Sequence, residues 1–400
     1  MRRLHVLAFT SLFRTPSEKV RAPFTSEFLR ALKEFADVTL VCPIPWAPDI
    51  AFTRDRPDWA RFVTAPRCAE VDGVQVHYTR YPMIPKLSGV LQPTLQAWAA
   101  WSTVRAIHEK QPVDVVNGRF VYPDGVAAAR LARRLGVPYV LTALGTDINI
   151  YATQRLKRGQ AARALQQAAH VTAVSPALAD RIAELGVDRS RIAAAVNGID
   201  LDRFRPDGDR VVLPPGAPGE GRKTLLTVAR LSQEKGLHVL VDALGLLARQ
   251  GRCDFHTVLV GDGPERDALQ ARLHELGLQD RVTLAGEVDH AAVPAWLRGA
   301  AGFCLPSFRE GTPNVVIEAL ATGIPVTSTN VGGTPLLLND SNGLLVEPGQ
   351  AEPLAQALHT MMSRAWDRDT IRRSVAHMSW RSEAERHAQL FERIACGAVA

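Results

Sequence analysis

The chain has 400 residues, of which 46% are hydrophobic and 22% are charged, and its net charge is +6. This length exceeds what one hydrophobic core usually serves, so we expect two domains, and the composition excludes a disordered or collagen-like chain. No apolar run approaches the ~18 residues of a membrane-spanning helix, and the basic residues form no dense run of the kind that binds nucleic acid.

In chain order, the first half alternates between short apolar runs and segments with helical spacing. The first run is interrupted by His5 and Thr10, which favours a buried strand over a signal peptide. Such alternation is typical of a mostly parallel sheet covered by helices. We expect strands at residues 4–10, 38–42, 74–78, 113–117, 139–142, 171–174 and 192–196, and helices at 125–135 and 155–168.

A stretch rich in glycine and proline then interrupts this pattern, which is typical of a linker. We predict an N-terminal domain at 1–205, a linker at 206–222, a C-terminal domain at 223–378 and a last helix at about 379–396 that packs back on the first domain. In the C-terminal domain we expect strands at 224–229, 256–260, 282–285, 302–305 and 325–328, and helices at 237–249 and 265–276. Ligands bind at the carboxyl ends of such strands, and the cleft between the domains is the expected site.

The segment that begins at Glu310 carries the most chemical information. Gly311 and Pro313 break the preceding structure, and Asn314 is expected to cap a helix that carries Glu318. The first turn of a helix favours a bound anion such as phosphate. A carboxylate beside that anion would accept hydrogen bonds from neutral hydroxyls, such as those of a ribose or a hexose. The segment therefore predicts a site for a sugar nucleotide.

Two cations follow the first strand of the C-terminal domain. Arg230 and Lys235 lie on one loop at the carboxyl end of the strand at 224–229. Arginine offers a planar fork and lysine a point charge, so the two together could hold a diphosphate. Two unconnected surface cations are the alternative. The expected position opposite Glu310 and Glu318 favours the diphosphate.

A glycine turn follows the next strand. Gly261 and Gly263 resemble half of a dinucleotide fingerprint, but Arg266 stands where a third glycine would be needed. A tight strand-to-helix turn close to a bound nucleotide is the better interpretation.

Two turns of the N-terminal domain carry polar residues after a strand. Asp147 could accept a hydrogen bond from a hydroxyl, although an Asx cap of a turn is an equal alternative. Asn197 precedes Gly198, and this pair is first a turn signal and second a ligand contact. The histidines form no metal-ligating pattern and no nucleophile motif occurs, so we expect neither a metal site nor a covalent enzyme nucleophile. The five scattered cysteines indicate a reducing, cytoplasmic setting.

Charge is distributed unevenly. Residues 1–205 hold 28 Lys and Arg against 18 Asp and Glu, whereas residues 206–400 hold 19 against 23. A basic first half could lie on an anionic membrane or receive an anionic acceptor. A solvated, arginine-rich surface is the alternative.

The sequence motifs described above, in this order, resemble those of the family 4 retaining glycosyltransferases of GT-B fold. The matching segments are Asn197-Gly198-Ile199-Asp200, Phe204-Arg205-Pro206, Ala229-Arg230-Leu231, Glu234-Lys235-Gly236, Val260-Gly261-Asp262-Gly263-Pro264, Glu310-Gly311-Thr312-Pro313-Asn314 and Glu318-Ala319-Leu320-Ala321-Thr322-Gly323-Ile324-Pro325-Val326. The resemblance is dense over about residues 196–360 and looser before them. It implies an α/β protein with two Rossmann-like β/α/β domains that face each other across a cleft.

The resemblance also implies roles for individual residues. Arg230 and Lys235 would bind the donor diphosphate, Glu318 the nucleotide ribose, and Glu310 the transferred sugar. Because the family is metal-independent, Arg230 and Lys235 would also stabilise the departing nucleoside diphosphate. The candidates for the catalytic site are Glu310, Asp147, Arg230 and Lys235, and those for the nucleotide-sugar site are Arg230, Lys235, Gly261, Gly263, Thr312, Pro313, Asn314, Val315 and Glu318.

The implied function is transfer of a hexose-type sugar from a nucleoside-diphosphate sugar, with UDP or GDP expected, to a glycan or lipid-linked acceptor with retention of configuration. We expect no further cofactor, a cytoplasmic protein and peripheral contact with the inner membrane face. The alternatives are a sugar-nucleotide-binding protein that has lost catalysis and an epimerase of nucleoside-diphosphate sugars. A dehydrogenase is disfavoured because the third glycine is absent.

Two features depart from the family. Leu144 stands where the family often has histidine, and its side chain cannot donate a hydrogen bond to a donor sugar. The family often has a glycine-rich turn after its first strand, whereas the first glycine here is Gly73. We therefore expect the loop at 10–23, with Arg14, Lys19 and Arg21, to shape the acceptor side differently.

Overall fold

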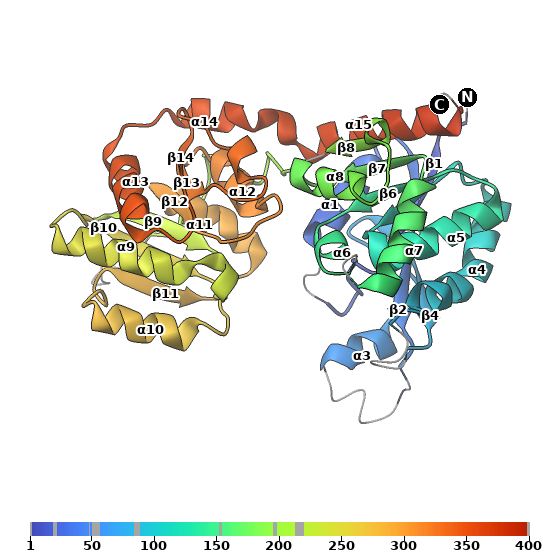
Figure 1. Ribbon diagram of the computed structural model, residues 1–400, viewed down its shortest axis with the longest axis horizontal. Helices are drawn as coiled ribbons and strands as arrows, with labels where there is room; N and C mark the ends of the chain where they lie inside the picture. The colour runs from blue at the N-terminus through green and yellow to red at the C-terminus, as the bar shows by residue number, and fades with distance from the viewer. Residues whose placement is uncertain are drawn as a thin grey trace. The chain divides into compact units, whose positions relative to one another are not determined.

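The computed structural model describes residues 2–18, 22–47, 49, 57–83, 89–151, 154–194, 198–212 and 220–397. The chain divides into two compact units, whose elements are labelled in Figure 1. Unit 1 comprises Met1–Gly198 and Trp380–Ala400, and unit 2 comprises Ile199–Ser379. Of the predicted linker, residues 213–219 lie outside the described part. Residues 206–212 belong to unit 2, where the N–H of Val211 donates to the carbonyl of Ala295 (2.9 Å).

Unit 1 is built on an eight-stranded sheet with the order β3-β4-β2-β1-β5-β6-β7-β8. All neighbouring strands are parallel except β3 and β4. The central strands β1, β5 and β6 are buried along their whole length, as expected for a parallel sheet covered on both faces. The strands are β1 (His5–Phe9), β2 (Asp37–Pro45), β3 (Cys68–Val71), β4 (Val74–Tyr81), β5 (Val115–Arg119), β6 (Tyr139–Ala143), β7 (His170–Ala173) and β8 (Ile192–Ala194).

Helices cover both faces of this sheet. One hydrophobic cluster packs α4, α5, α7 and α8 on one face, and a second packs α1 and α15 on the other. The last helix packs on α1 within unit 1 and buries Ala384, Ala388 and Phe391. The helices are α1 (Pro23–Leu32), α3 (Pro57–Thr64), α4 (Gln92–Lys110), α5 (Val126–Leu135), α6 (Thr146–Asn149), α7 (Arg155–Gln166), α8 (Pro176–Ala183) and α15 (Trp380–Ala395), with short turns η1 (Val121–Gly125) and η3 (Arg189–Arg191).

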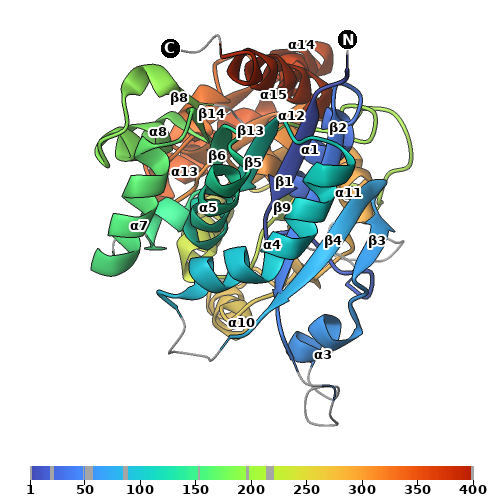
Figure 2. The ribbon, with the colours of Figure 1, turned by 90° about the vertical axis from the view of Figure 1, so that its right-hand side faces the viewer.

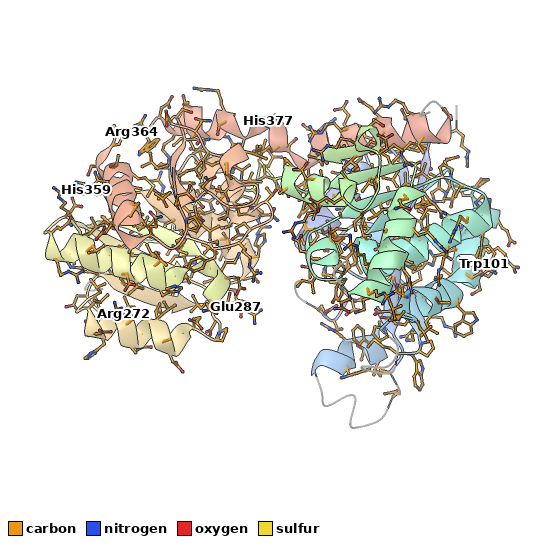
Figure 3. The ribbon with its side chains drawn as sticks, viewed as in Figure 1. Trp101, Arg272, Glu287, His359, Arg364 and His377 are labelled. Carbon is orange, nitrogen blue, oxygen red and sulfur yellow. The ribbon has the colours of Figure 1, made fainter. Side chains whose placement is uncertain are left out.

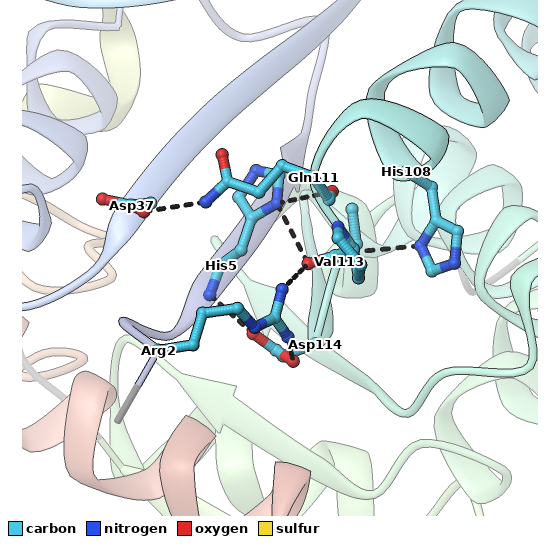
Figure 4. A network of polar contacts seen from close by, with 8 residues as sticks. Arg2, His5, Asp37, His108, Gln111, Val113 and Asp114 are labelled. Atoms are coloured by element: carbon cyan, nitrogen blue, oxygen red, sulfur yellow. Dashed lines mark hydrogen bonds and ion pairs between the residues drawn. The ribbon is translucent and has the colours of Figure 1, made fainter.

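A polar network holds the amino ends of three strands of this sheet (Figure 4). The N–H of His5, which begins β1, donates to Asp114 before β5 (2.8 Å), and the ring Nδ1 of His5 contacts the carbonyl of Gln111 (3.1 Å). The side chain of Gln111 donates to Asp37 at the start of β2 (2.8 Å). These contacts tie β1, β2 and β5 together at their amino ends.

Unit 2 contains a six-stranded, fully parallel sheet with the order β11-β10-β9-β12-β13-β14. Its core joins α9 and α13 to the sheet. The strands are β9 (Lys223–Val228), β10 (Phe255–Val260), β11 (Val282–Gly286), β12 (Gly302–Leu305), β13 (Val326–Thr329) and β14 (Gly343–Val346). The helices are α9 (Leu237–Arg249), α10 (Arg266–Glu275), α11 (Val293–Gly299), α12 (Asn314–Ala321), α13 (Ala351–Ser363) and α14 (Arg368–Ser374), with short turns η4 (Gln233–Lys235), η5 (His290–Ala292), η6 (Thr334–Leu336) and η7 (Ala376–Met378).

Each sheet has a point where the order of its strands reverses. In unit 2 the chain adds β10 and β11 on one side of β9 and then places β12 on the other side. In unit 1 the same reversal lies between β1 and β5. Loops diverge at such a point and leave a crevice at the carboxyl ends of the strands, where ligands of open α/β sheets bind.

The α/β fold class predicted from the sequence is confirmed. The predicted strands and helices appear with ends shifted by at most three residues, and the predicted strand at 192–196 runs into undescribed residues after position 194. No range was predicted from the sequence for the strands β3 and β14 or for the helices α1, α3, α4, α8, α11, α13 and α14.

Candidate functional site

Two loops meet at the reversal point of unit 2 and bring opposite charges together. Lys235 lies on the loop after β9 and Glu310 on the loop after β12, and Lys235 Nζ is 2.7 Å from Glu310 Oε1. The two side chains are 24% and 10% exposed. Ser307 also donates to Glu310 Oε1 (2.6 Å). The carboxylate is therefore held by one cation and one hydroxyl.

The backbone keeps these two loops in contact. The N–H of Phe308 donates to the carbonyl of Glu234 (2.8 Å). Gly236 ends η4 with a left-handed backbone (φ 63°), and a Cβ there would collide with the carbonyl oxygen of Pro306. Only glycine satisfies both conditions, so Gly236 allows the lysine loop to lie against the loop that carries Glu310.

Arg230 begins the same loop and is exposed. Its neighbours are anchored to the turn after β10, because Ala229 N–H donates to Val260 (3.0 Å) and Leu231 N–H to Asp262 (2.9 Å). A Cβ at Gly261 would collide with the carbonyl oxygen of Ala229, and one at Gly263 with that of Leu231. The close approach of the arginine loop therefore explains why both positions are glycine. Their contact with a nucleotide stays a prediction.

The start of α12 differs from the prediction in one respect. Asn314 is the first helical residue, and Pro313 occupies the N-cap position with an extended backbone, so the predicted Asn314 cap is wrong. Pro313 also has no N–H to offer a ligand. The turn is held instead by the N–H of Gly333, which donates to the carbonyl of Gly311 (2.6 Å). The first-turn N–H groups of α12, which include those of Asn314 and Val315, still have no acceptor within the helix.

Glu318 lies in the second turn of α12 with its side chain 9% exposed. Its Oε1 is 3.3 Å from Nε2 of His290, and Nη2 of Arg203 is 3.0 Å from Nδ1 of the same ring. Arginine can only donate, so Nδ1 accepts and the ring proton resides on Nε2, which donates to Glu318. Arg203 also donates to the backbone carbonyl of His290. This chain of contacts fixes the orientation of the Glu318 carboxylate.

Asp147 is held by backbone hydrogen bonds. It is fully buried at the start of α6 and accepts hydrogen bonds from the N–H groups of Val121, Leu144, Gly145 and Ile148. Burial raises the pKa of this carboxyl, and the four backbone donors oppose that effect. We therefore correct its role from contact with substrate to positioning of the loops after β5 and β6.

A second buried carboxylate marks the reversal point of unit 1. Asp124, in η1 after β5, accepts hydrogen bonds from the Ser11 N–H (2.6 Å), the Ser11 hydroxyl (2.8 Å) and the Gln96 amide (2.9 Å). The hydroxyl of Thr10, after β1, lies 3.3 Å away. Burial raises the pKa of Asp124 to about 6. The sequence analysis missed this residue, because nothing in the local pattern places it beside Ser11.

The remaining predicted positions are placed as follows. Leu144 is partly buried against the core of unit 1, and its N–H is bound to Asp147. In the loop at 10–23, Arg14 pairs with Asp72 (Nε to Oδ2 2.9 Å), while Lys19 and Arg21 lie outside the described residues. Asn197 also lies outside them.

Ser307, His290 and Arg203 are contributors that sequence reasoning missed. Ser307 stands three residues before Glu310, a spacing that could have indicated it. His290 and Arg203 carry no such signal, because they meet Glu318 only through the fold. Across the described ranges, no group of three or more His, Cys, Asp or Glu could hold a metal ion. In the same part of the chain, every helix is too short or too polar to cross a membrane.

The chain is similar in sequence to known glycosyltransferases. Residues 24–203 match the family described as Glycosyltransferase Family 4, and residues 222–364 match Glycosyl transferases group 1. TuaC of Bacillus subtilis (strain 168), a glycosyltransferase assigned to teichuronic acid biosynthesis, is 30% identical over 363 residues. The aligned region covers 89% of this chain and 88% of that protein.

The fold is similar to that of solved GT-B structures. Sucrose-phosphate synthase from Thermosynechococcus elongatus gives a TM-score of 0.74 at 20% identity, with 99% of this chain and 100% of that chain covered. HepE of Anabaena in complex with UDP-glucose gives a TM-score of 0.61 at 17% identity, with 99% of each chain covered. At these identities the likeness establishes the fold alone.

Proposed function

Because the chain belongs to the family 4 glycosyltransferases of GT-B fold, we propose that it transfers a hexose-type sugar from a nucleoside-diphosphate sugar to a glycan or lipid-linked acceptor with retention of anomeric configuration. Glycosyl transfer follows from the family. The hexose, the acceptor and retention are our proposal. The assignment of TuaC to teichuronic acid biosynthesis supports a polysaccharide precursor as the acceptor.

The observation that carries this proposal is the ion pair between Lys235 and Glu310 at the reversal point of unit 2. The ammonium of Lys235 suits the diphosphate, and the carboxylate of Glu310 suits the hydroxyls of the adjoining sugar. The bond that breaks in the reaction joins this diphosphate to this sugar, so the pair has one group for each side of that bond. Arg230 lies on the same loop and is exposed, and it would add a fork of donors to the diphosphate.

Each group then has a distinct role in the reaction. As the bond to the sugar breaks, negative charge grows on the departing diphosphate, and Lys235 and Arg230 would stabilise it without reorganising. Glu310, held by Ser307, would orient the sugar. Glu318, oriented by His290, would accept hydrogen bonds from the nucleotide ribose. In this proposal no metal ion is needed, because the two cations supply the positive charge.

The first experiment is a thermal-shift screen with UDP, GDP, ADP and their glucose, galactose, mannose and N-acetylglucosamine derivatives. A ligand that binds only the folded state raises the melting temperature by mass action. UDP or GDP is the expected nucleotide, and the complex of HepE with UDP-glucose makes UDP the first to test. No shift with any nucleotide at millimolar concentration would contradict the donor site.

The second experiment tests the reaction itself. The donor that shifts the melting temperature is incubated with lipid-linked and free glycan acceptors, and the anomeric configuration of the product is read by NMR. A product with the donor's configuration supports retention, and an inverted product rejects it. Conversion of the donor without any acceptor would instead indicate the epimerase, and binding without any turnover would indicate a protein that has lost catalysis.

We also propose that the enzyme works in the cytoplasm, at the inner face of the membrane, and contacts anionic lipid through its basic N-terminal half. The excess of Lys and Arg over Asp and Glu in residues 1–205 supports this contact. No role in nucleic-acid binding is proposed, because the basic residues form no dense run.

A further inference from the structure

Two helices on one face of unit 1, α5 and α7, carry positive charge and no acidic residue. Helices α4, α5 and α7 lie side by side on one face of the sheet (Figure 2). From residue 125 to residue 179 the only acidic residue is Asp147, which is fully buried. The basic residues of α5 and α7 are Arg130, Arg133, Arg134, Arg155, Lys157, Arg158 and Arg163.

Several other arginines of unit 1 are paired with carboxylates. These pairs include Arg2–Asp114, Arg61–Glu18, Arg105–Glu109, Arg189–Asp180 and Arg381–Glu34. Among the described residues, no carboxylate comes within 4.0 Å of a basic group of α5 or α7 in an ion pair. The basic residues of α5 and α7 therefore differ from these paired arginines.

A groove of about 400 Å³ lies between α5 and α7. Arg130, Arg133 and Arg163 line it together with apolar residues that include Val126 and Leu156. Arg130 donates to the hydroxyl of Thr94, and Arg133 to the amide oxygen of Gln167 (3.1 Å), so neutral partners orient two of the guanidinium groups. Burial and the charge of Arg133 lower the pKa of Arg130. The groove therefore holds hydrogen-bond donors that are already oriented, and a bound anion would stabilise their positive charge.

Exposed apolar side chains lie on or beside α4 and α7, and one of them, Leu156, lines the groove. Leu156, at the start of α7, is 67% exposed, and Trp98, one turn after Thr94 on α4, is 68% exposed. Leu91, which precedes α4, is also exposed. The guanidinium of Arg134 lies over the ring of Trp101 (4.0 Å), which is labelled in Figure 3. Aromatic and aliphatic side chains beside arginines are typical of surfaces that lie in the headgroup region of a bilayer.

We propose that this face docks on an anionic lipid bilayer and that the groove between α5 and α7 receives a lipid headgroup phosphate. Guanidinium groups form paired hydrogen bonds with phosphate oxygens, which matches the three arginines of the groove. Leu156 and Trp98 would enter the boundary between headgroups and acyl chains. The inference deepens the membrane contact proposed above and is independent of the donor and of the reaction.

The test is co-sedimentation with vesicles of phosphatidylcholine that contain 30% phosphatidylglycerol, compared with vesicles of phosphatidylcholine alone. The double variant Arg133→Gln/Arg163→Gln removes two charges from the groove. Each basic residue near an anionic surface contributes ~1 kcal/mol, so at ~1.4 kcal/mol per decade we expect roughly 25-fold weaker binding. Trp98→Ser should also weaken binding, without any change of charge.

The matched control is Arg189→Gln/Arg381→Gln, which changes net charge equally but outside the α4, α5 and α7 face. It should bind the anionic vesicles within about threefold of the wild type. Equal loss in both double variants would mean that net charge alone drives binding and would overturn the proposal, as would equal binding of the wild type to both kinds of vesicle. Thermal shifts with the nucleotide, measured on every variant, show that folding and the donor site are intact.

Discussion

The ion pair between Lys235 and Glu310 predicts that substitutions of its two residues have opposite effects on nucleotide binding. In the free protein the ammonium is 2.7 Å from the carboxylate, so a bound diphosphate must share that cation with Glu310. Lys235→Ala removes a donor to the phosphate, whereas Glu310→Gln removes the competing charge and leaves the lysine in place. The first variant should bind a nucleoside diphosphate more weakly than the wild type, and the second more tightly.

The magnitudes follow from the contacts. A hydrogen bond to a charged group contributes about 1.5–3 kcal/mol, so Lys235→Ala should raise the Kd for the nucleoside diphosphate roughly 10- to 150-fold. The ion pair is partly exposed, which places it between an exposed pair of about 0–1 kcal/mol and a buried one of about 3–5 kcal/mol. An intermediate coupling of about 1–2 kcal/mol predicts that Glu310→Gln lowers that Kd about 5- to 30-fold. Sugar transfer should fall in both variants.

Isothermal titration calorimetry with the nucleoside diphosphate measures both effects, and a radiolabelled-donor assay measures transfer. Lys223→Ala is the matched control, because Lys223 begins the same strand β9 and its Nζ donates to the carbonyl of Met362 (2.9 Å). It should leave the nucleotide Kd unchanged. If Glu310→Gln weakens nucleotide binding as much as Lys235→Ala does, the carboxylate does not compete for the cation and the reasoning fails.

Three further predictions concern positioning, pH and backbone strain. His290→Phe should raise the donor KM about tenfold through loss of the hydrogen bond to Glu318. His290→Gln retains a hydrogen-bond donor and should bring the KM most of the way back to the wild-type value. Equal KM values for both variants and the wild type would reject the role of His290 in orienting Glu318. The pKa of Asp124 is raised from 3.8 to about 6 by burial, so its contribution to stability, about 3 kcal/mol at 1.36 kcal/mol per pKa unit, is greatest below pH ~4 and is lost as pH rises through ~6. Thermal unfolding from pH 4 to 7.5 should show this loss in the wild type and not in Asp124→Asn. Gly261→Ala should lower the free energy of unfolding, measured by chemical denaturation, more than Gly277→Ala does. Both positions have a positive φ, which costs a residue with a Cβ ~1–2 kcal/mol. Only at Gly261 would the added Cβ also collide with the backbone.

Much of unit 2 could be predicted because its strands are short, apolar and bounded by glycine, proline and charged residues. That pattern placed Arg230 and Lys235 at the carboxyl end of a strand, and the structure confirms this location. It could not show that Lys235 meets Glu310, 75 positions further along the chain. The pairing depends on β12 lying beside β9 and not beside β11, and the order of strands in a sheet is set by long-range packing.

Asp147 and Asn314 show where local motifs are ambiguous. A carboxylate after a strand can face a ligand or accept hydrogen bonds from its own backbone. For Asp147 the choice depends on the N–H of Val121, which belongs to a different loop. Asn314 suits a cap by residue type, but the extended backbone of Pro313 already fills the N-cap position. In both cases the residue type allowed two structures, and a neighbour outside the motif decided between them.

The two reversal points differ in charge, and that difference supports the placement of the donor in unit 2. At the reversal point of unit 1, Asp124 is fully buried and its hydrogen-bond donors on Ser11, Thr10 and Gln96 are all neutral. Burial without a cation holds its pKa near 6, so a second negative charge nearby would be repelled once the carboxyl ionises. At the reversal point of unit 2, Glu310 is bound to Lys235, whose ammonium has three donors and can serve a carboxylate and a phosphate together. In our proposal the charged donor nucleotide therefore binds at the reversal point of unit 2, whereas the buried Asp124, already bound to Ser11, Thr10 and Gln96, holds the loops of unit 1 in position.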